Sequence, residues 1–298
     1  MGAAQRRRKT DWGTAGFVVG LLAPGLLLYF FLVLWPMGQS FWVALHRWRG
    51  VSGRMTFVGL DNFAELLRDE KLRFALGHNL VFLVIVALTI IPLALFFANA
   101  LAQRLRGVEL FRALFLFPNV VSMVAVSTLW MFLYNPNWGL VNATLRALHL
   151  DALAVTWLAD ARTVLPAVAL TYVWYVLGFY VLLLRAGIQG ISADVNEAAI
   201  VDGATERQRF RFITLPLLNE ILRLSVIYLV INSFNVFALV WIMAPPSGTG
   251  GATEVALTYL YQKGFVEQQF GYSTAIGAVN FVLVMGITLL LQRIWRVE

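Results

Sequence analysis

The chain has 298 residues, of which 60% are hydrophobic and only 13% charged, and its mean hydropathy of +0.75 excludes a soluble globular domain. It contains no cysteine, so disulfides, thiolate chemistry and cysteine-ligated metal sites are excluded. The net charge of +7 would suit nucleic acid, but its distribution along the chain favours membrane orientation instead.

Six apolar runs are long enough to cross a bilayer, because about 20 helical residues span a hydrocarbon core about 30 Å thick. Backbone groups in lipid must be paired within the segment, and no run alternates as a barrel strand does. The sequence therefore predicts an all-α polytopic membrane protein with six transmembrane helices. We place them near residues 16–35, 79–101, 111–134, 163–184, 221–243 and 273–291.

The first run follows four basic residues, Arg6 to Lys9. A basic stretch before an apolar run also describes a signal peptide. This run is longer than a typical signal core, and no clear small-residue cleavage site precedes Pro36. We interpret it as a retained helix (15–37) after a short cytoplasmic tail (1–14).

The interval 38–77 is polar and is predicted to be an outer loop. Within it, Asp61 is a plausible N-cap for a short amphipathic helix that ends at Arg68. Phe63, Leu66 and Leu67 share one face of that helix, which is typical of a segment lying against a bundle.

The remaining chain, 78–292, is predicted to be the core membrane domain, followed by a cytoplasmic tail, 293–298. Pro92 is a kink candidate in the second span, and Pro118 lies inside the third. A tight turn at 103–107, a loop at 135–160 and a break from Pro245 to Gly251 separate the spans.

The lysines and arginines orient the chain. With six spans and the N-terminus inside, 14 of them fall on the cytoplasmic side and 9 on the outer side. The excess lies inside, as the positive-inside rule requires. The sequence thus predicts that both termini are cytoplasmic.

The sequence lacks the motifs expected for ATP binding, metal binding and catalysis by a membrane enzyme. The chain has no phosphate-binding loop of the G-x-x-x-x-G-K-[ST] type, so we expect it to bind no ATP. Its three histidines lie far apart without metal-ligand spacing, and no constellation suits a membrane enzyme. A stand-alone secondary carrier stays open as an alternative, but its usual coupling acid within a span is not evident.

The cytoplasmic loop 186–218 carries charges of both signs between two apolar spans. Residues 193–201 are rich in helix formers, and Gly203 allows the backbone to turn. Residues 205–212 can form a second short helix, and Pro216 suits the start of the next membrane helix. From composition alone this could be a merely solvated loop.

The loop also resembles a known family. The pattern E-A-A, three residues, G, nine residues, I-x-L-P is met by Glu197, Ala198, Ala199, Gly203, Ile213, Leu215 and Pro216, with Asp202 before the glycine. It is similar to the motif of the permease subunits of binding-protein-dependent ABC importers. The segment 58–63, VGLDNF, resembles their carbohydrate-uptake branch, the maltose, glycerol-3-phosphate and trehalose type. The residues at 244–248, APPSG, depart from the family's usual TGGGP.

The resemblance implies a type I importer permease in a bacterial or archaeal inner membrane. Glu197 would anchor a coupling helix in an ATPase subunit, Ala198 and Ala199 would pack closely, and Gly203 would form the turn. The expected partners are a second permease, two ATPase subunits that bind ATP and magnesium, an extracellular solute-binding protein and a sugar. No cofactor is expected in this chain, and alternating access would move the solute.

The solute path is predicted from residue types. A sugar needs amide hydrogen bonds and aromatic faces, and polar side chains inside spans usually face the bundle interior. Helix–helix hydrogen bonding and packing are the alternative roles for these residues. The candidates are Asn232, Phe234, Asn235 and Phe237 in the fifth span and Tyr172, Trp174 and Tyr175 in the fourth.

Overall fold

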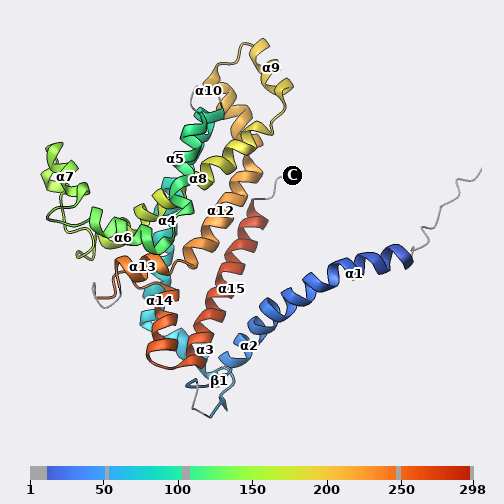
Figure 1. The fold of residues 1–298 in the computed structure, drawn as a ribbon, viewed down its shortest axis with the longest axis vertical. Coiled ribbons are helices and arrows are strands. Elements are labelled where there is room, and N and C mark those ends of the chain that lie inside the picture. Colours follow the sequence, from blue (N-terminus) through green and yellow to red (C-terminus); the bar gives the residue numbers. More distant parts are fainter. Residues whose placement is uncertain (1–11, 51–53, 103–107, 246–249, 296–298) are drawn as a thin grey trace, which may run out of the picture.

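The computed structural model describes residues 12–50, 54–102, 108–245 and 250–295 (Figure 1). Residues 1–11 of the expected N-terminal tail, the tight turn at 103–107, residues 246–249 of the expected break and residues 296–298 of the expected C-terminal tail lie outside this part. Four helices are long and apolar enough to span a membrane: Gly16–Ala44, Glu70–Ala102, Val164–Gln189 and Phe270–Ile294. Two bent helix pairs bring the number to as many as six, as predicted.

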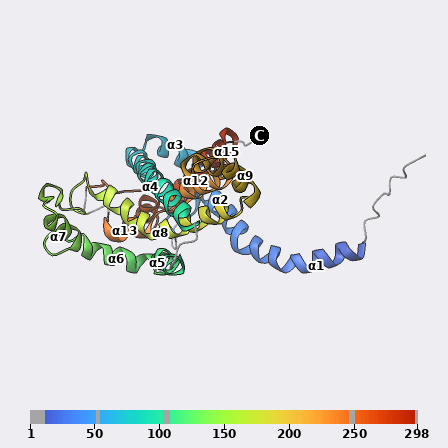
Figure 2. The same ribbon diagram turned by 90° about the horizontal axis from the view of Figure 1, so that it is seen from above.

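The N-terminal helix is longer than predicted. It comprises α1 (Trp12–Tyr29), a π-helical turn (Phe30–Leu34) and α2 (Trp35–Ala44). Pro36 does not end it, because proline is tolerated in the first turn of a helix and Pro36 stands there in α2. Figures 1 and 2 show α1 pointing away from the other helices, while α2 packs along α15.

The outer interval contains more structure than an amphipathic helix. The strands β1 (His46–Arg47) and β2 (Thr56–Phe57) pair antiparallel, and α3 (Asp61–Arg68) follows. Leu60 holds the cap position of α3, so Asp61 is its first residue and not its N-cap. Leu66 is buried as predicted, but Leu67 is 86% exposed, so the predicted apolar face is wrong at that position.

The core is built on two long helices, α4 (Glu70–Ala102) and α8 (Val164–Gln189), which pack along each other. α4 begins nine residues before the predicted span and passes through Pro92. Fully buried side chains from both helices, such as Phe82, Ile90, Val168 and Leu184, form the main apolar cluster. Other helices, α12 and α13 among them, pack around this cluster.

The predicted third span is not a straight helix. It consists of α5 (Val108–Val120) and α6 (Met123–Leu133), and the two are bent by 106°. Pro118 cannot donate a backbone hydrogen bond, and Ser122 is extended with ψ 136°. The next segment, predicted to be a loop, contains α7 (Leu140–Ala147) and a 3₁₀ turn (Asp151–Leu153).

The C-terminal half is also more broken than predicted. After the loop 186–218, α12 (Asn219–Phe234) ends in a turn at Asn235, and α13 (Ala238–Met243) follows. The predicted span 221–243 is thus interrupted near its middle. The chain continues through α14 (Ala256–Tyr261), a π-helical turn (Gln262–Val266) and α15 (Phe270–Ile294).

Candidate functional site

The loop between α8 and α12 begins with the short helix α9 (Ala193–Val201). Its N-cap is Ser192, whose hydroxyl accepts a hydrogen bond from the backbone N–H of Asp194 at 3.2 Å. Asp194 in the first turn adds a negative charge at the positive end of the helix. Local capping therefore fixes where α9 starts.

Gly203 fixes where α9 ends. The glycine has φ +76°, in the left-handed region that residues with a Cβ rarely adopt. Its N–H donates to the carbonyl of Ile200 at 3.0 Å, and the N–H of Ala204 donates to the carbonyl of Ala199 at 2.9 Å. These two bonds form a Schellman motif, so the glycine predicted as the turn ends the helix.

α9 protrudes from the end of the helix bundle (Figure 1). Glu197 and Ala198 are exposed on it, while Ala199 is buried. Three large apolar side chains on the same helix are open to solvent: Val195 at 42%, Ile200 at 56% and Val201 at 87% exposure. An exposed apolar patch with polar residues around it is typical of a protein-binding surface.

The second half of the loop turns back to the bundle. Thr205 and Gln208 form a capping box at the start of α10 (Glu206–Arg209). A π-helical turn (Phe210–Thr214) and α11 (Leu215–Leu217), with Pro216 in its first turn, lead to α12 across a 65° bend. Ile213 and Leu215 are partly buried, and Pro216 is exposed. Asp202 is the exposed C-cap of α9.

The start of α9 lies beside two membrane helices, α8 and α12, at a common groove. A groove of about 570 Å³ is lined by Gly187 of α8, Val195 of α9, Leu217 of α11 and Ile221 of α12. A Cβ at Gly187 would overlap the side chain of Ile221, so α8 and α12 approach closely there.

The polar candidates in the fifth span lie at the break between α12 and α13. The Asn232 amide donates to the carbonyl of Tyr228 at 2.7 Å, and the Asn235 amide donates to that of Ile231 at 2.8 Å. Both side chains are at least partly exposed. Phe234 is fully buried, whereas Phe237 is partly exposed and stacks on Trp241 with a ring separation of 5.7 Å.

The aromatic candidates in α8 differ in exposure. Tyr172 is buried and contacts Phe82. Trp174 is partly exposed and packs edge to face against Trp130, and the Tyr175 hydroxyl reaches the carbonyl of Asn119 at 3.5 Å. Within the described chain, no ring contact or hydrogen bond joins these three to the candidates in α12 and α13.

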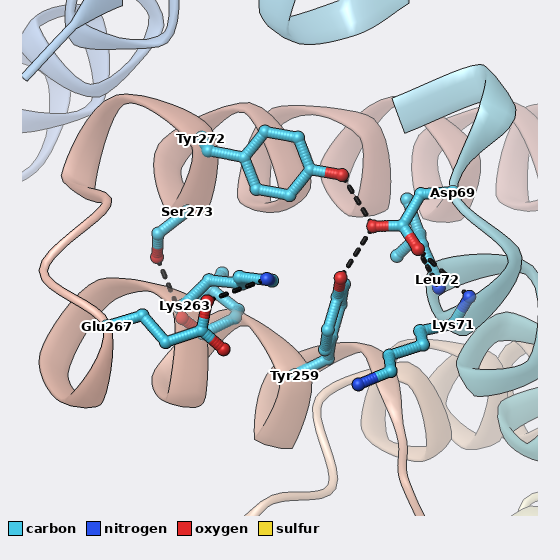
Figure 3. Close-up of polar contacts among 9 residues, drawn as sticks. Asp69, Lys71, Leu72, Tyr259, Lys263, Glu267, Tyr272 and Ser273 are labelled. Atoms are coloured by element: carbon cyan, nitrogen blue, oxygen red, sulfur yellow. Dashed lines mark hydrogen bonds and ion pairs between the residues drawn. The ribbon is translucent and has the colours of Figure 1, made fainter. Parts of the chain in front are cut away.

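A polar cluster at the opposite end of the bundle was not foreseen. The Tyr259 and Tyr272 hydroxyls each donate to Asp69 Oδ2 at 2.5 Å, and the backbone N–H groups of Lys71 and Leu72 donate to Oδ1 (Figure 3). Burial acts to raise the pKa of Asp69, but these hydrogen bonds outweigh it and hold that pKa below its usual value. Asp69 is 190 residues or more from both tyrosines, so no sequence spacing signals the cluster.

A cavity of about 760 Å³ adjoins this cluster. It is lined by Lys71 and His78 of α4, Trp241 of α13, Glu254 and Gln262. Burial raises the pKa of the Glu254 carboxyl, although the nearby charge of Lys71 opposes that shift. The cavity therefore lies between the start of α4 and later parts of the chain. The two tyrosines link α14 and α15 to Asp69, which directly precedes α4.

Comparison with known proteins is consistent with this arrangement. Residues 90–296 match the family model described as binding-protein-dependent transport system inner membrane component. The diacetylchitobiose uptake system permease protein NgcF of Streptomyces coelicolor is 34% identical over 288 residues, covering 93% of this chain and 82% of that protein. The trehalose/maltose transport system permease protein MalF of Thermococcus litoralis is 32% identical over 277 residues, covering 93% and 92%.

A solved structure shares the fold. A chain from the crystal structure of a bacterial ABC transporter involved in the import of the acidic polysaccharide alginate superposes with a TM-score of 0.83. The match covers 96% of this chain and 97% of that one at 23% sequence identity. The two chains therefore share one overall fold.

Proposed function

The chain belongs to the family of binding-protein-dependent transport system inner membrane components, and from that membership we propose that it is a permease subunit of an ATP-driven sugar importer. The named relatives handle diacetylchitobiose and trehalose or maltose, which supports a sugar as the solute. The alternative, a stand-alone secondary carrier, has no comparable support. The chain is a multi-pass protein of the inner membrane.

The observation that carries this proposal is the protruding α9. Glu197 and Ala198 lie open on a helix whose two ends are fixed by Ser192 and Gly203. Such a rigid, exposed element suits a groove in an ATPase subunit, with Glu197 as the polar anchor and Val201 as an apolar contact. ATP and magnesium would be bound by that partner.

The groove at the root of α9 suggests how the motion is transmitted. Val195 and Leu217 of the loop line the same groove as Gly187 of α8 and Ile221 of α12. Closure of the ATPase pair would shift α9 and thereby tilt α8 against α12. Alternating access requires an element of this kind, with a different contact to the partner in each state.

The solute would pass beside the break between α12 and α13. We assign Asn232 and Asn235 to hydrogen bonds with sugar hydroxyls, and Phe237, Trp174 and Tyr175 to stacking. Phe234 and Tyr172 are covered in this conformation, so they would reach a solute only after a rearrangement of the helices.

The assembly would contain a second permease, two ATPase subunits and an extracellular solute-binding protein. The positive-inside excess supports cytoplasmic termini, and with that orientation α9 would lie on the ATPase side. Purification of the tagged chain with the products of its neighbouring genes would identify the partners, and sugar binding to the neighbouring solute-binding protein would identify the solute.

The substitution Glu197→Lys tests the coupling role. We expect the complex to insert into the membrane normally. Its sugar uptake and its ATPase activity stimulated by the solute-binding protein should each fall at least tenfold, because a lysine cation replaces the carboxylate anchor at an exposed site. The measurement compares uptake into liposomes with ATP hydrolysis in the reconstituted complex. Asp151→Lys, an equal charge change at an exposed 3₁₀ turn outside the loop, serves as the control. Coupled transport at the wild-type rate by the Glu197→Lys complex would overturn the assignment.

A further inference from the structure

A second cavity lies between α12 and α15, at the end of the bundle where α9 is found (Figure 1). It measures about 680 Å³ and is lined by Glu220, Arg223, Leu224 and Ile227 of α12 and by Leu289, Gln292 and Arg293 of α15. None of these residues has a place in the coupling or the solute path described above.

The polar end of this cavity is cationic. Arg223 is partly buried, and one terminal nitrogen donates to the carbonyl of Trp295 at 3.1 Å, while the other terminal nitrogen lies 3.7 Å from Glu220. The Glu220 side chain is 81% exposed, so water screens that ion pair. Arg293 forms no ion pair or hydrogen bond within the described chain. Two guanidinium groups thus share one cavity with a single, solvated carboxylate.

The rest of the cavity is apolar. Leu224 and Leu289 are 54% and 57% exposed, and buried Ile227 lies behind them. The apolar surface continues along α15 through Met285 and Val282, both of which are exposed. The cavity therefore has a cationic end near the helix termini and an apolar strip directed along the membrane span.

From this geometry we propose that the cavity binds an anionic phospholipid. The guanidinium groups of Arg223 and Arg293 hold the phosphate, because a guanidinium can donate two parallel hydrogen bonds to phosphate oxygens. The acyl chain covers Leu224 and Leu289. Basic pockets between transmembrane helices are suited to such head groups, and a soluble anion would leave the apolar strip bare.

Binding there would also tie α12 to α15. α12 directly follows the loop that carries α9, so the lipid would hold the end of the helix that α9 moves. The lipid is thus a structural ligand whose identity does not depend on the transported sugar.

The test is native mass spectrometry of the complete, detergent-solubilised complex, with dioleoylphosphatidylglycerol and dioleoylphosphatidylcholine as probes. We expect the phosphatidylglycerol to bind at least tenfold more tightly than the phosphatidylcholine. The double variant Arg223→Gln/Arg293→Gln should lose that preference. The matched control Arg68→Gln/Arg162→Gln removes the same charge at two exposed positions elsewhere and should keep it.

Three results would overturn the proposal. The first is an unchanged lipid preference in the double variant. The second is equal binding of glycerol phosphate and phosphatidylglycerol, which would indicate a site for a soluble anion. The third is lipid binding by the chain alone that disappears in the assembled complex, which would indicate that a partner subunit covers the cavity. The single variant Arg293→Gln, at an exposed position without a partner in the described chain, keeps the test valid if the double variant does not fold.

Discussion

At the residue scale, Asp69 shows how one side chain can join distant parts of the chain. One carboxylate oxygen, Oδ1, caps the start of α4, and the other, Oδ2, accepts hydrogen bonds from the hydroxyls of Tyr259 in α14 and Tyr272 in α15. Lys263 lies over both tyrosine rings and pairs with Glu267 at 2.7 Å, so the two tyrosines also contact a cation (Figure 3). Hydrogen bonds to an ionised group are stronger than those between neutral groups.

The substitution Asp69→Asn should therefore destabilise the protein by about 1–3 kcal/mol, because charge-assisted bonds become neutral ones and the amide nitrogen cannot accept the two hydrogen bonds of the carboxylate oxygen that it replaces. The folded-state pKa of Asp69 is lowered, so its contribution is present above the unfolded-state pKa of about 3.9 and is lost as the pH falls through the folded-state value. The melting-temperature difference between the two proteins, followed by tryptophan fluorescence, should be constant from pH 6 to 8 and shrink in acid. The control Glu70→Gln, at an exposed ion pair, should have little effect. A difference that does not change in acid would contradict this account.

At the element scale, the sequence can predict which residues form a helix without revealing how closely that helix packs on its neighbour. Gly178 of α8 lies against the backbone of α5, and a Cβ there would overlap the carbonyl oxygen of Phe115. This close approach allows α5 to cross α8 before the chain bends into α6.

The substitution Gly178→Ala should thus force α5 away from α8 and destabilise the protein by about 1–3 kcal/mol, the usual range for overpacking. The matched control is Gly77→Ala in α4, where a Cβ meets no atom within 4 Å. That change should stabilise the protein by about 0.5–1 kcal/mol, because alanine suits a helix interior better than glycine. Thermal melts of the two variants should therefore shift in opposite directions, and equal shifts would refute the close-contact explanation.

Elements governed by local signals were predictable from the sequence. The helix formers of 193–201 and Gly203 indicated α9 and its end, because capping depends on neighbours only a few residues away. The bend after Pro118 and the break at Asn235 were missed, since a proline or asparagine in an apolar run is equally compatible with a continuous helix. The Asp69 cluster was missed because its members meet only in the folded chain.

At the scale of the whole molecule, the N-terminal helix α1 lies apart from the other helices. The most apolar window of the span Gly16–Ala44 is 0% buried, and α1 points away from the core in both views (Figures 1 and 2). Gly16 and Gly20 stand four residues apart on one face of α1, and a Cβ at either would meet no atom within 4 Å. Small residues at this spacing let two membrane helices approach closely.

We therefore expect α1 to pack against the second permease through Gly16 and Gly20. The substitution Gly20→Leu would place a bulky side chain on that face and should reduce the second permease recovered with the tagged chain by about half or more. Gly25→Leu is the matched control, because at about 100° per residue Gly25 lies opposite Gly16 on the helix. The ratio of the two permeases in purified complexes, measured by quantitative mass spectrometry, checks this. If both variants reduce recovery equally, any bulky side chain on α1 weakens the assembly, and the face that carries Gly16 and Gly20 is not the contact.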